Sequence, residues 1–348
     1  MSTNRMCLKV RVSEFYKIKE LLAKLCVIDL SFNIMTIDGH VLIPLIDSHD
    51  ILKKINRQVE IVPCNPDRRN LRGLRLKDIV KDYLSEDAVN LIPSSYDIIG
   101  DIIVLPPLSE DFIKSYGCFI AHALKILHPR IRAVYVRSET MGKYRIRALK
   151  LIWGNKVEYT IYKEHGIKFY VIPDKVYINP SLSTEHLRLT ELIDNGSKVL
   201  DMFAGIGGFT LNIAMRKNVD IVAVDINPWA IKCLLKSIQL NSKYMKSKVL
   251  VLNTDSHLLP LILRHKVFDH IIMNLPHGSL EFLNDAVKLV RNRGILHVYI
   301  IGESKENAYK KLEEEITKIG HECSSYSVVK VLEYAPYKYI YRVTCEVV

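Results

Sequence analysis

A regular alternation of strand-like and helix-like runs fills the chain from about residue 179 onward, and it constrains the fold more than any other feature. Short apolar runs typical of buried strands are separated by stretches with helical spacing. The helical stretches are 208–217, 228–241, 257–264, 279–292 and 303–319. Two more strand-like runs, at 324–332 and 339–347, complete the pattern as a hairpin. This order predicts an α/β fold with a doubly wound, Rossmann-like sheet.

The turn after the first strand of this region carries closely spaced glycines. Asp201 is followed by Met-Phe-Ala-Gly205-Ile-Gly207-Gly-Phe209, where a helix is expected to begin. Glycine allows a sharp turn and a close approach to a ligand, and a helix N-terminus presents free N–H groups. Asp225 ends the next strand, where an acidic side chain can accept both hydroxyls of a ribose. The loop therefore predicts a cofactor that contains adenosine.

Two details distinguish between cofactors of this kind. A dinucleotide loop has a third glycine, whereas this chain has Thr210 at that position. Asp201 lies four residues before Gly205, where a carboxylate suits an ammonium group better than a pyrophosphate. Both details favour S-adenosylmethionine and a methyltransferase over a nicotinamide-dependent oxidoreductase. For Asp225, the alternative to ribose binding is a purely structural role as a cap at the end of the strand. Asp255, after the third strand, is expected either to contact the adenine or to cap the next helix.

A second signal follows the fourth strand, in Asn274-Leu-Pro276-His277. The carboxyl ends of the strands face the ligand crevice in such a sheet, so Asn274 is expected beside the cofactor. Short loops of the form Asn-X-Pro-X are common in methyltransferases that act on ring or exocyclic nitrogens. The alternative is an ordinary strand-to-helix turn. His277 is expected either to touch the substrate or to be a solvated turn residue.

The formal net charge of +11 favours a polyanionic partner, although a lysine-rich, heat-adapted surface would have the same composition. Basic and aromatic residues concentrate between 68 and 150, which fits a phosphate-binding face. The candidates are Arg68, Arg69, Arg72, Arg130, Arg132, Arg137, Lys143 and Tyr144. The composition thus points to nucleic acid as the partner.

The seven cysteines are odd in number and contain no C-x-x-C pair. This pattern predicts no disulfide framework, no zinc site and a reduced, cytoplasmic compartment. No His/Cys cluster with ligand spacing is visible, so no metal site is expected. The sequence also has no apolar stretch typical of a signal peptide or a membrane span.

The chain is long enough for two or three domains. Residues 1–64 alternate as a small α+β unit, and Pro63-Cys-Asn-Pro66 is typical of a linker. Residues 65–178 form a mixed α/β middle region rich in arginine. Residues 179–348 hold the doubly wound sheet. The expected order is therefore a small N-terminal domain, a middle domain and a methyltransferase domain.

Together these residues resemble the archaeal and eukaryotic tRNA (guanine-37-N1)-methyltransferase family over nearly the whole chain. Several separate motifs carry the resemblance, and their combination is more specific than any one of them. The matching stretches are Tyr96–Asp101, Tyr144–Arg147, Lys163–His165, Lys175–Tyr177, Asn179–Glu185, Asp201–Phe209, Asp225–Pro228 and Asn274–Pro276. The resemblance implies methyl transfer to N1 of guanosine-37 in tRNA. A dual-specificity or wyosine-intermediate methyltransferase of the same family is the alternative.

The resemblance also implies residue roles. Glu185 would be the general base, Arg145 (with Arg147 as the alternative) would hold O6 of the guanine, and Asn274 with Pro276 would orient its edge. The residues expected at the cofactor are Tyr177, Asp201, Phe203, Gly205, Gly207, Asp225, Ile226, Asn227, Asp255 and Asn274. A monomer that docks on the tRNA elbow and anticodon stem-loop is expected, with at most a loosely bound magnesium ion.

Two positions depart from the family pattern. Gly208 stands where proline is frequent, and His277 stands where lysine is frequent.

Overall fold

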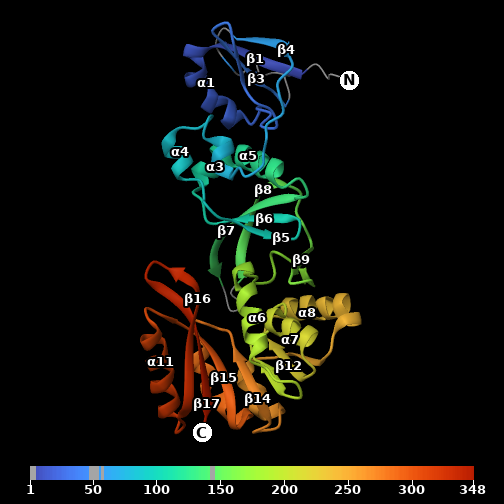
Figure 1. Ribbon diagram of the computed structural model, residues 1–348, viewed down its shortest axis with the longest axis vertical. Helices are drawn as coiled ribbons and strands as arrows, with labels where there is room; N and C mark the ends of the chain where they lie inside the picture. Colours follow the sequence, from blue (N-terminus) through green and yellow to red (C-terminus); the bar gives the residue numbers. More distant parts are fainter. Residues whose placement is uncertain (1–4, 47–54, 56–58, 142–145) are drawn as a thin grey trace. The chain divides into compact units, whose positions relative to one another are not determined.

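The computed structural model describes residues 5–46, 55, 59–141 and 146–348, and the side chains of 139–147 lie outside the description. The chain forms two compact units, one of Met1–Glu139 with Leu149–Val157 and one of Thr140–Ala148 with Glu158–Val348. Figure 1 shows their elements in chain order.

The first unit begins with a four-stranded antiparallel sheet of order β2-β3-β1-β4. Helix α1 follows β1 directly and buries Phe15, Ile18 and Leu22. The element bounds are β1 Arg5–Arg11, α1 Val12–Leu25, β2 Met35–Ile37, β3 His40–Pro44 and β4 Glu60–Cys64. The small α+β arrangement predicted for this region is confirmed. The short helix expected near 48–55 falls largely outside the described residues.

A second sheet of the same unit has the order β5-β6-β7-β8, in which β6 and β7 are parallel. Gly100 has a positive φ and lies in the turn between the antiparallel strands β5 and β6. The bounds are α3 Leu76–Val80, α4 Glu86–Asn90, β5 Asp97–Ile99, β6 Ile102–Leu105, α5 Glu110–Leu127, β7 Ala133–Met141 and β8 Ile146–Gly154. One apolar core runs from Leu8 in β1 to Val136 in β7.

The second unit holds a seven-stranded sheet of order β13-β12-β11-β14-β15-β17-β16. The first five strands are parallel, and β17 runs antiparallel to both of its neighbours. The bounds are β11 Lys198–Asp201, β12 Asp220–Asp225, β13 Lys248–Asn253, β14 Phe268–Met273, β15 Val290–Gly302, β16 Cys323–Ala335 and β17 Lys338–Val347. The doubly wound sheet with a terminal hairpin is thus confirmed. Its order reverses between β11 and β14, which is where such sheets bind ligands.

Helices cover both faces of this sheet (Figure 1). Helices α6 and α7 share one core with the sheet, and α10 and α11 share another. The bounds are α6 Ser183–Glu191, α7 Gly208–Arg216, α8 Pro228–Asn241, α9 Leu259–Ile262, α10 Leu283–Leu289 and α11 Lys305–Lys318. The predicted C-terminal end of the helix over 279–292 is wrong, because the long strand β15 begins at Val290.

A two-stranded hairpin, β9 (Thr160–Glu164) with β10 (Ile167–Val171), belongs to the second unit. Side chains of α8 bind its backbone: Ser237 Oγ accepts from the Tyr170 amide at 2.8 Å, and Asn241 bonds both backbone groups of Lys168. Backbone contacts therefore group residues 158–178 with the large sheet, whereas the sequence placed the boundary at 178/179. The three-domain division stays a prediction.

The cysteine pattern predicted that the protein has no disulfides, and this prediction is wrong. Disulfides join Cys7 to Cys64, Cys26 to Cys118 and Cys323 to Cys345, and Cys233 is buried and free. The partners lie 57, 92 and 22 residues apart, so only the tertiary fold brings them together. Disulfides occur inside the cells of hyperthermophiles as well as outside cells, so the cysteines no longer support an assignment of compartment.

Within the described part of the chain, no helix combines the length and apolarity that crossing a bilayer would need.

Candidate functional site

The loop after β11 is tied to the end of β12 by the carboxylate of Asp225. Its Oδ2 accepts the Gly205 amide at 2.8 Å and its Oδ1 accepts the Asn227 amide at 2.8 Å. Burial raises the pKa of this carboxyl group. Asp225 therefore fixes the shape of the loop, and its carboxylate oxygens keep further lone pairs that can accept hydrogen bonds from a ligand. The capping role and the predicted ribose-binding role are thus compatible.

The two glycines of the loop are required for different reasons. Both have positive φ, 56° for Gly205 and 97° for Gly207. A Cβ on Gly205 would meet nothing within 4 Å, so this glycine faces open space. A Cβ on Gly207 would lie 2.5 Å from Leu234 Cδ1 on α8. Gly205 thus leaves room beside the loop, whereas Gly207 lets α7 pack closely against α8.

Asp201 lies at the end of β11 with no solvent exposure. Thr210 donates to its Oδ2 at 2.7 Å, while its Oδ1 has no hydrogen-bond partner among the described residues. Burial raises the pKa of Asp201 to about 6. In the sequence, Thr210 only marks the absence of a third glycine. In the structure, its hydroxyl group holds the Asp201 carboxylate in place.

Asn227 connects a further predicted residue to this loop. Its Oδ1 caps α8 by accepting the Trp229 amide at 3.0 Å, and its Nδ2 donates to the Lys175 carbonyl at 2.8 Å. This contact holds the segment before Tyr177 at the end of β12, and the Tyr177 side chain is 40% exposed. Tyr177 therefore follows a segment that is anchored at the end of β12 and is itself partly exposed to solvent.

The remaining predicted cofactor residues lie on neighbouring loops. Phe203 packs edge-on against Phe282 at 4.9 Å, and Ile226 is half-buried. Asp255 accepts the His257 amide at 3.1 Å and so caps the short helix that follows. The capping interpretation of Asp255 is confirmed, and its contact with adenine stays a prediction.

The loop Asn274-Leu-Pro-His277 is held in place by the side chain of Ser279, which was not predicted from the sequence. Buried Ser279 accepts the Leu275 amide at 3.1 Å and donates toward the carbonyls of Met273, at 2.7 Å, and Leu275, at 2.9 Å. Asn274 and Pro276 are half-buried at this strand end. His277 is exposed and packs edge-on against Tyr334 at 4.9 Å. The loop geometry is thus fixed by Ser279.

Glu185, the predicted general base, lies in the first turn of α6 and is only 2% exposed. Tyr299 donates to its Oε1 at 2.9 Å, and Nε of Arg342 lies 3.1 Å from the same atom. Arg188 donates to Oε2 at 3.4 Å. Burial and Glu185 hold the pKa of Tyr299 well above its usual value, so Tyr299 remains a donor. Sequence spacing could not reveal Tyr299 and Arg342 as partners, because they lie on β15 and β17.

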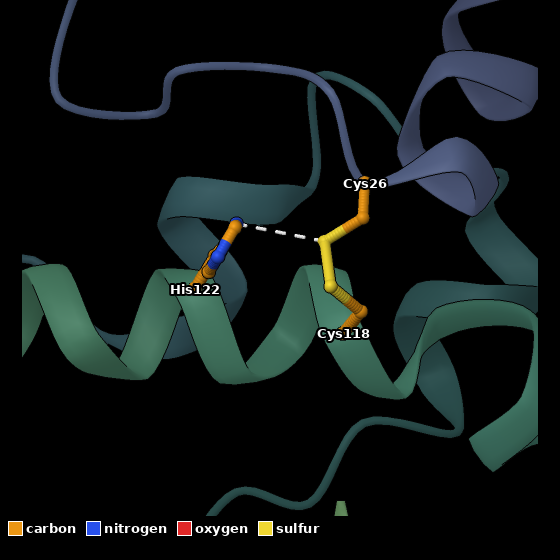
Figure 2. A group of neighbouring side chains, drawn as sticks. All are labelled: Cys26, Cys118 and His122. Carbon is orange, nitrogen blue, oxygen red and sulfur yellow. Dashed lines mark hydrogen bonds between the residues drawn. A yellow bond between two sulfur atoms is a disulfide. The ribbon is translucent and has the colours of Figure 1, made fainter. Parts of the chain in front are cut away.

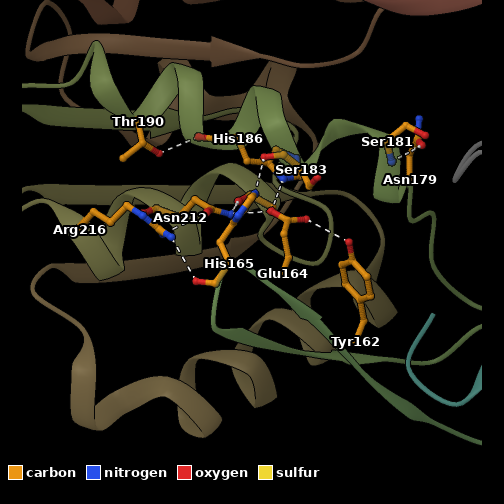
Figure 3. A network of polar contacts seen from close by, with 11 residues as sticks. Tyr162, Glu164, His165, Asn179, Ser181, Ser183, His186, Thr190, Asn212 and Arg216 are labelled. Atoms are coloured by element: carbon orange, nitrogen blue, oxygen red, sulfur yellow. Dashed lines mark hydrogen bonds and ion pairs between the residues drawn. The ribbon is translucent and has the colours of Figure 1, made fainter. Parts of the chain in front are cut away.

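A buried polar network holds α6 against α7 (Figure 3). Oε1 of Glu164 accepts from His186 Nδ1 at 2.7 Å and from Asn212 Nδ2 at 2.9 Å. The His186 ring also packs against the cofactor loop, since a Cβ on Gly208 would lie 2.6 Å from it. Gly208 is therefore needed because His186 occupies the space of a side chain. Since Glu185 precedes His186, the network also positions the predicted base.

The predicted arginines lie apart from this network or outside the description. Arg145 falls among residues that are not described, and nothing is stated of the Arg147 side chain. Arg69 is structural, because it donates to the Ile79 carbonyl at 3.1 Å and to Tyr83 Oη at 3.2 Å. Its assignment to an RNA-binding face is therefore not supported by its contacts.

Five other predicted nucleic-acid contacts lie among the described residues. Arg132 pairs with Asp101 at 2.5 Å and Arg137 with Asp97 at 3.3 Å. Arg68 lies over the Phe32 ring at 5.9 Å, and Arg72 and Arg130 are exposed. Lys143 and Tyr144 fall outside the described residues.

The described residues fit S-adenosylmethionine on three observations. The buried Oδ1 of Asp201 lacks a donor and suits an ammonium group, Gly205 faces open space, and the Asp225 carboxylate is held in one orientation by two amides. A donor-poor carboxylate at this strand end is unfavourable for a pyrophosphate. The set therefore suits an adenosine carrying a cationic amino-acid tail.

Comparison with known proteins decides the family. The TRM5/TYW2 methyltransferase domain matches residues 160–329, and the TYW2 N-terminal domain matches residues 76–157. A tRNA (guanine(37)-N(1))-methyltransferase Trm5b from Pyrococcus abyssi is 30% identical over 96% of this chain and 96% of its own length. The chain belongs to the TRM5/TYW2 methyltransferase family. It is thus a methyltransferase of the S-adenosylmethionine-dependent class.

Two other members of the TRM5/TYW2 family bear on its substrate. The complex structure of aTrm5 and tRNALeu superposes with a TM-score of 0.66 at 29% identity, covering 98% of this chain and 99% of that one. The tRNA (guanine(37)-N(1))/4-demethylwyosine(37)-methyltransferase Taw22 of Nanoarchaeum equitans is 26% identical over 69% of this chain and 93% of its own length.

The expectation that no His/Cys cluster exists is not met by the structure. Cys26, Cys118 and His122 lie together in the first unit, with all their potential ligand atoms within 4.8 Å of one another. The sequence signal was the spacing Cys118-x-x-x-His122 on one helix, which places both side chains on the same face.

Proposed function

We propose that this protein transfers the methyl group of S-adenosylmethionine to N1 of guanosine-37 in tRNA. The observation that carries the proposal is the near full-length similarity to tRNA (guanine(37)-N(1))-methyltransferase Trm5b, at 30% identity over 96% of both chains. The site supports it independently, because the loop of Asp201, Gly205 and Asp225 suits the cofactor.

The chemistry requires a base, because N1 of guanine carries a proton at neutral pH. We assign the base to Glu185: its carboxylate takes the N1 proton as the N1 lone pair bonds to the methyl carbon and the carbon–sulfur bond breaks. Bound S-adenosylmethionine supplies the electrophilic methyl group. General-base help of this kind contributes about 10²–10⁴-fold in rate. Tyr299 and Arg342 orient the Glu185 carboxylate through its Oε1.

The other residues of the site position the base and the cofactor. Arg145, or Arg147 in its place, would hold O6 of the guanine and stabilise the negative charge that develops there. Asn274 and Pro276 would orient the edge of the base from the loop that Ser279 holds. Asp201 would face the ammonium group of the cofactor, and Asp225 its ribose. Tyr177 would lie beside the cofactor or the extruded base.

The tRNA would be bound through exposed arginines of the first unit, of which Arg72 and Arg130 are examples. Guanosine-37 lies in a stacked loop and must leave the stack to reach the cofactor, at a cost of a few kcal/mol. We further propose that the enzyme acts in the cytoplasm as a monomer, and that a loosely bound magnesium ion assists it. Light scattering in solution and activity after chelation test the last two points.

The decisive experiment incubates the protein with radiolabelled S-adenosylmethionine and a tRNA transcript that carries G37. Label should appear on this transcript and not on a matched G37→A transcript, and nucleoside mass spectrometry should identify 1-methylguanosine. Label on the G37→A control with none on the G37 transcript would overturn the proposal.

A second substrate is suggested by the similarity to Taw22. A dual-specificity enzyme would also methylate tRNA that carries 4-demethylwyosine at position 37. The same assay with this modified tRNA distinguishes the two cases, because a mono-specific enzyme would label only the guanosine-37 transcript.

A further inference from the structure

A cluster of two cysteines and a histidine lies in the first unit, far in the chain from the residues assigned to methyl transfer. Cys26 immediately follows α1 in a left-handed conformation with φ of 58°, while Cys118 and His122 lie one turn apart on α5. Figure 2 shows the Cys26–Cys118 disulfide with the imidazole of His122 directed at it. Sγ of Cys26 is 3.5 Å from Nδ1 of His122. Packing of α1 on α5 thus brings two sulfur atoms and an imidazole nitrogen together.

The donor set is the one that zinc prefers. Two thiolates and an imidazole bind tetrahedral Zn²⁺ at about 2.3 Å for sulfur and about 2.0 Å for nitrogen. Ligands of such an ion lie about 3.5–3.8 Å from one another, by tetrahedral geometry on those bond lengths. The separation of 3.5 Å between Cys26 Sγ and His122 Nδ1 already has this value. The ligand atoms of Cys118 and His122 also lie within 4.8 Å of one another, and the two sulfurs must separate, which reduction of their bond permits.

The cluster is also accessible. Cys118 is exposed, and Cys26 and His122 are half-buried. A metal ion and a thiol reductant can therefore reach the sulfurs from solvent, and water can fill a fourth coordination position. The buried thiol of Cys233 and the disulfides Cys7–Cys64 and Cys323–Cys345 belong to no such group among the described residues.

We propose that Cys26, Cys118 and His122 form a redox-controlled zinc site that alternates with the disulfide. A dithiol reduces the Cys26–Cys118 bond by taking its place as a disulfide, and two protons and two electrons pass to the cysteine sulfurs. Zn²⁺ then binds both sulfurs and His122 and releases the two thiol protons. A small-molecule disulfide reverses the exchange: it accepts two electrons from the cysteine sulfurs and two protons from water to become a dithiol, the Cys26–Cys118 bond forms again, and the metal is released.

Both the disulfide state and the zinc-bound state would connect α1 to α5. The disulfide closes a loop between residues 92 apart, and zinc bound to the same two sulfurs would close the same loop. The reduced, metal-free protein would lack this connection. The site is therefore a point at which redox state and metal supply set the stability of the first unit, independently of the methyltransferase activity.

The test uses the full-length protein, reduced with excess dithiol, desalted without oxygen and titrated with Co²⁺ as a spectroscopic substitute for Zn²⁺. One equivalent of cobalt should give a sulfur-to-cobalt charge-transfer band and visible absorption typical of tetrahedral coordination. Zinc should remove both signals, and prior oxidation should prevent them. Absence of the bands in the reduced protein would overturn the proposal.

Variants assign the signals to these residues. Cys118→Ser and Cys26→Ser should each abolish the one-equivalent charge-transfer band, and His122→Ala should weaken cobalt binding by at least tenfold. Cys323→Ser, in another disulfide, is the matched control and should leave the titration unchanged. A band that survives Cys118→Ser and Cys26→Ser but disappears in Cys323→Ser would place the metal elsewhere and refute the assignment. Circular dichroism confirms that each variant is folded.

Discussion

Nε of Arg342 lies 3.1 Å from Oε1 of Glu185, and both side chains are at most 3% exposed. A buried ion pair of this kind costs desolvation on both sides, so each partner depends on the other. NH1 of Arg342 has no hydrogen-bond partner among the described residues, which leaves Glu185 as its compensating charge. The predicted general base is thus also part of the sheet core.

Removing only the arginine should destabilise the protein strongly. Arg342→Met leaves the buried Glu185 carboxylate with only the exposed Arg188 as a cation, at 3.4 Å, and losses of about 3–5 kcal/mol are typical when a buried pair is broken. The double variant Arg342→Met with Glu185→Gln should recover part of the loss, because no buried charge remains. Urea unfolding of the two single variants and the double variant measures the coupling. Strictly additive losses would show that the pair is not coupled.

Glu185→Gln should lower turnover by about 10²–10⁴-fold if Glu185 is the base. The affinity of the folded protein for tRNA should change only slightly, because the change preserves shape, but stability should fall as well, because buried Arg342 loses its counter-charge. Glu191→Gln is the matched control, since Glu191 ends the same helix and is exposed. Single-turnover rates and filter binding separate the two effects. An equal loss of tRNA affinity would make Glu185 a structural residue.

Cofactor affinity should depend on pH through Asp201. Burial raises the pKa of this carboxyl group to about 6 in the free protein, and an ammonium group favours its ionised form. Protons therefore compete with the cofactor below pH 6, and affinity should fall about tenfold between pH 7 and pH 5. Calorimetry checks this, with Asp201→Asn expected to bind more weakly and without this pH dependence.

Methylthioadenosine is the matched ligand for that experiment, because it lacks the amino-acid tail. Its affinity should stay nearly constant over the same pH range. An equal pH dependence for both ligands would mean that Asp201 does not face the ammonium group.

Acid should destabilise the second unit through His270 and His297. The rings stack 5.4 Å apart between β14 and β15, and burial lowers the pKa of both side chains, most strongly for fully buried His297. The folded state keeps them neutral while the unfolded chain binds protons below about pH 6.5. Stability is thus present above that pH and is lost as the pH falls, by up to about 1.4 kcal/mol per pH unit for each histidine.

Urea midpoints measured from pH 7.5 to pH 5 should fall less steeply for His270→Asn than for the unmodified protein. His265→Asn, at an exposed histidine, is the matched control and should leave the slope unchanged. Parallel slopes in all three proteins would contradict the role of the buried pair.

Local signals in the sequence predicted much of this architecture. The expected helix over 228–241 matches α8 at both ends, because Asn227 caps it and Pro228 suits its first turn. The succession of strands and helices along the chain and the position of the cofactor loop followed from periodicity and glycine spacing. The helix expected over 257–264 is shorter, since only Leu259–Ile262 is α-helical.

Contacts between residues distant in the chain could not be predicted in this way. Arg342 reaches Glu185 only after β17 has paired with β15, and Cys26 reaches Cys118 only after α1 has packed on α5. Neither contact leaves a pattern of spacing in one sequence. The predicted base was therefore found by resemblance, while its partners and the cysteine–histidine cluster came from the fold.

The packing of His186 against Gly208 has an evolutionary consequence. With the ring 2.6 Å from where a Cβ would stand, a proline or alanine at position 208 is compatible only with a smaller or displaced side chain at position 186. The two positions should therefore covary among relatives, one in the cofactor loop and the other beside the predicted base. A sequence signature that covers only the loop would then score Gly208 as a mismatch, although the residue at position 186 compensates for it.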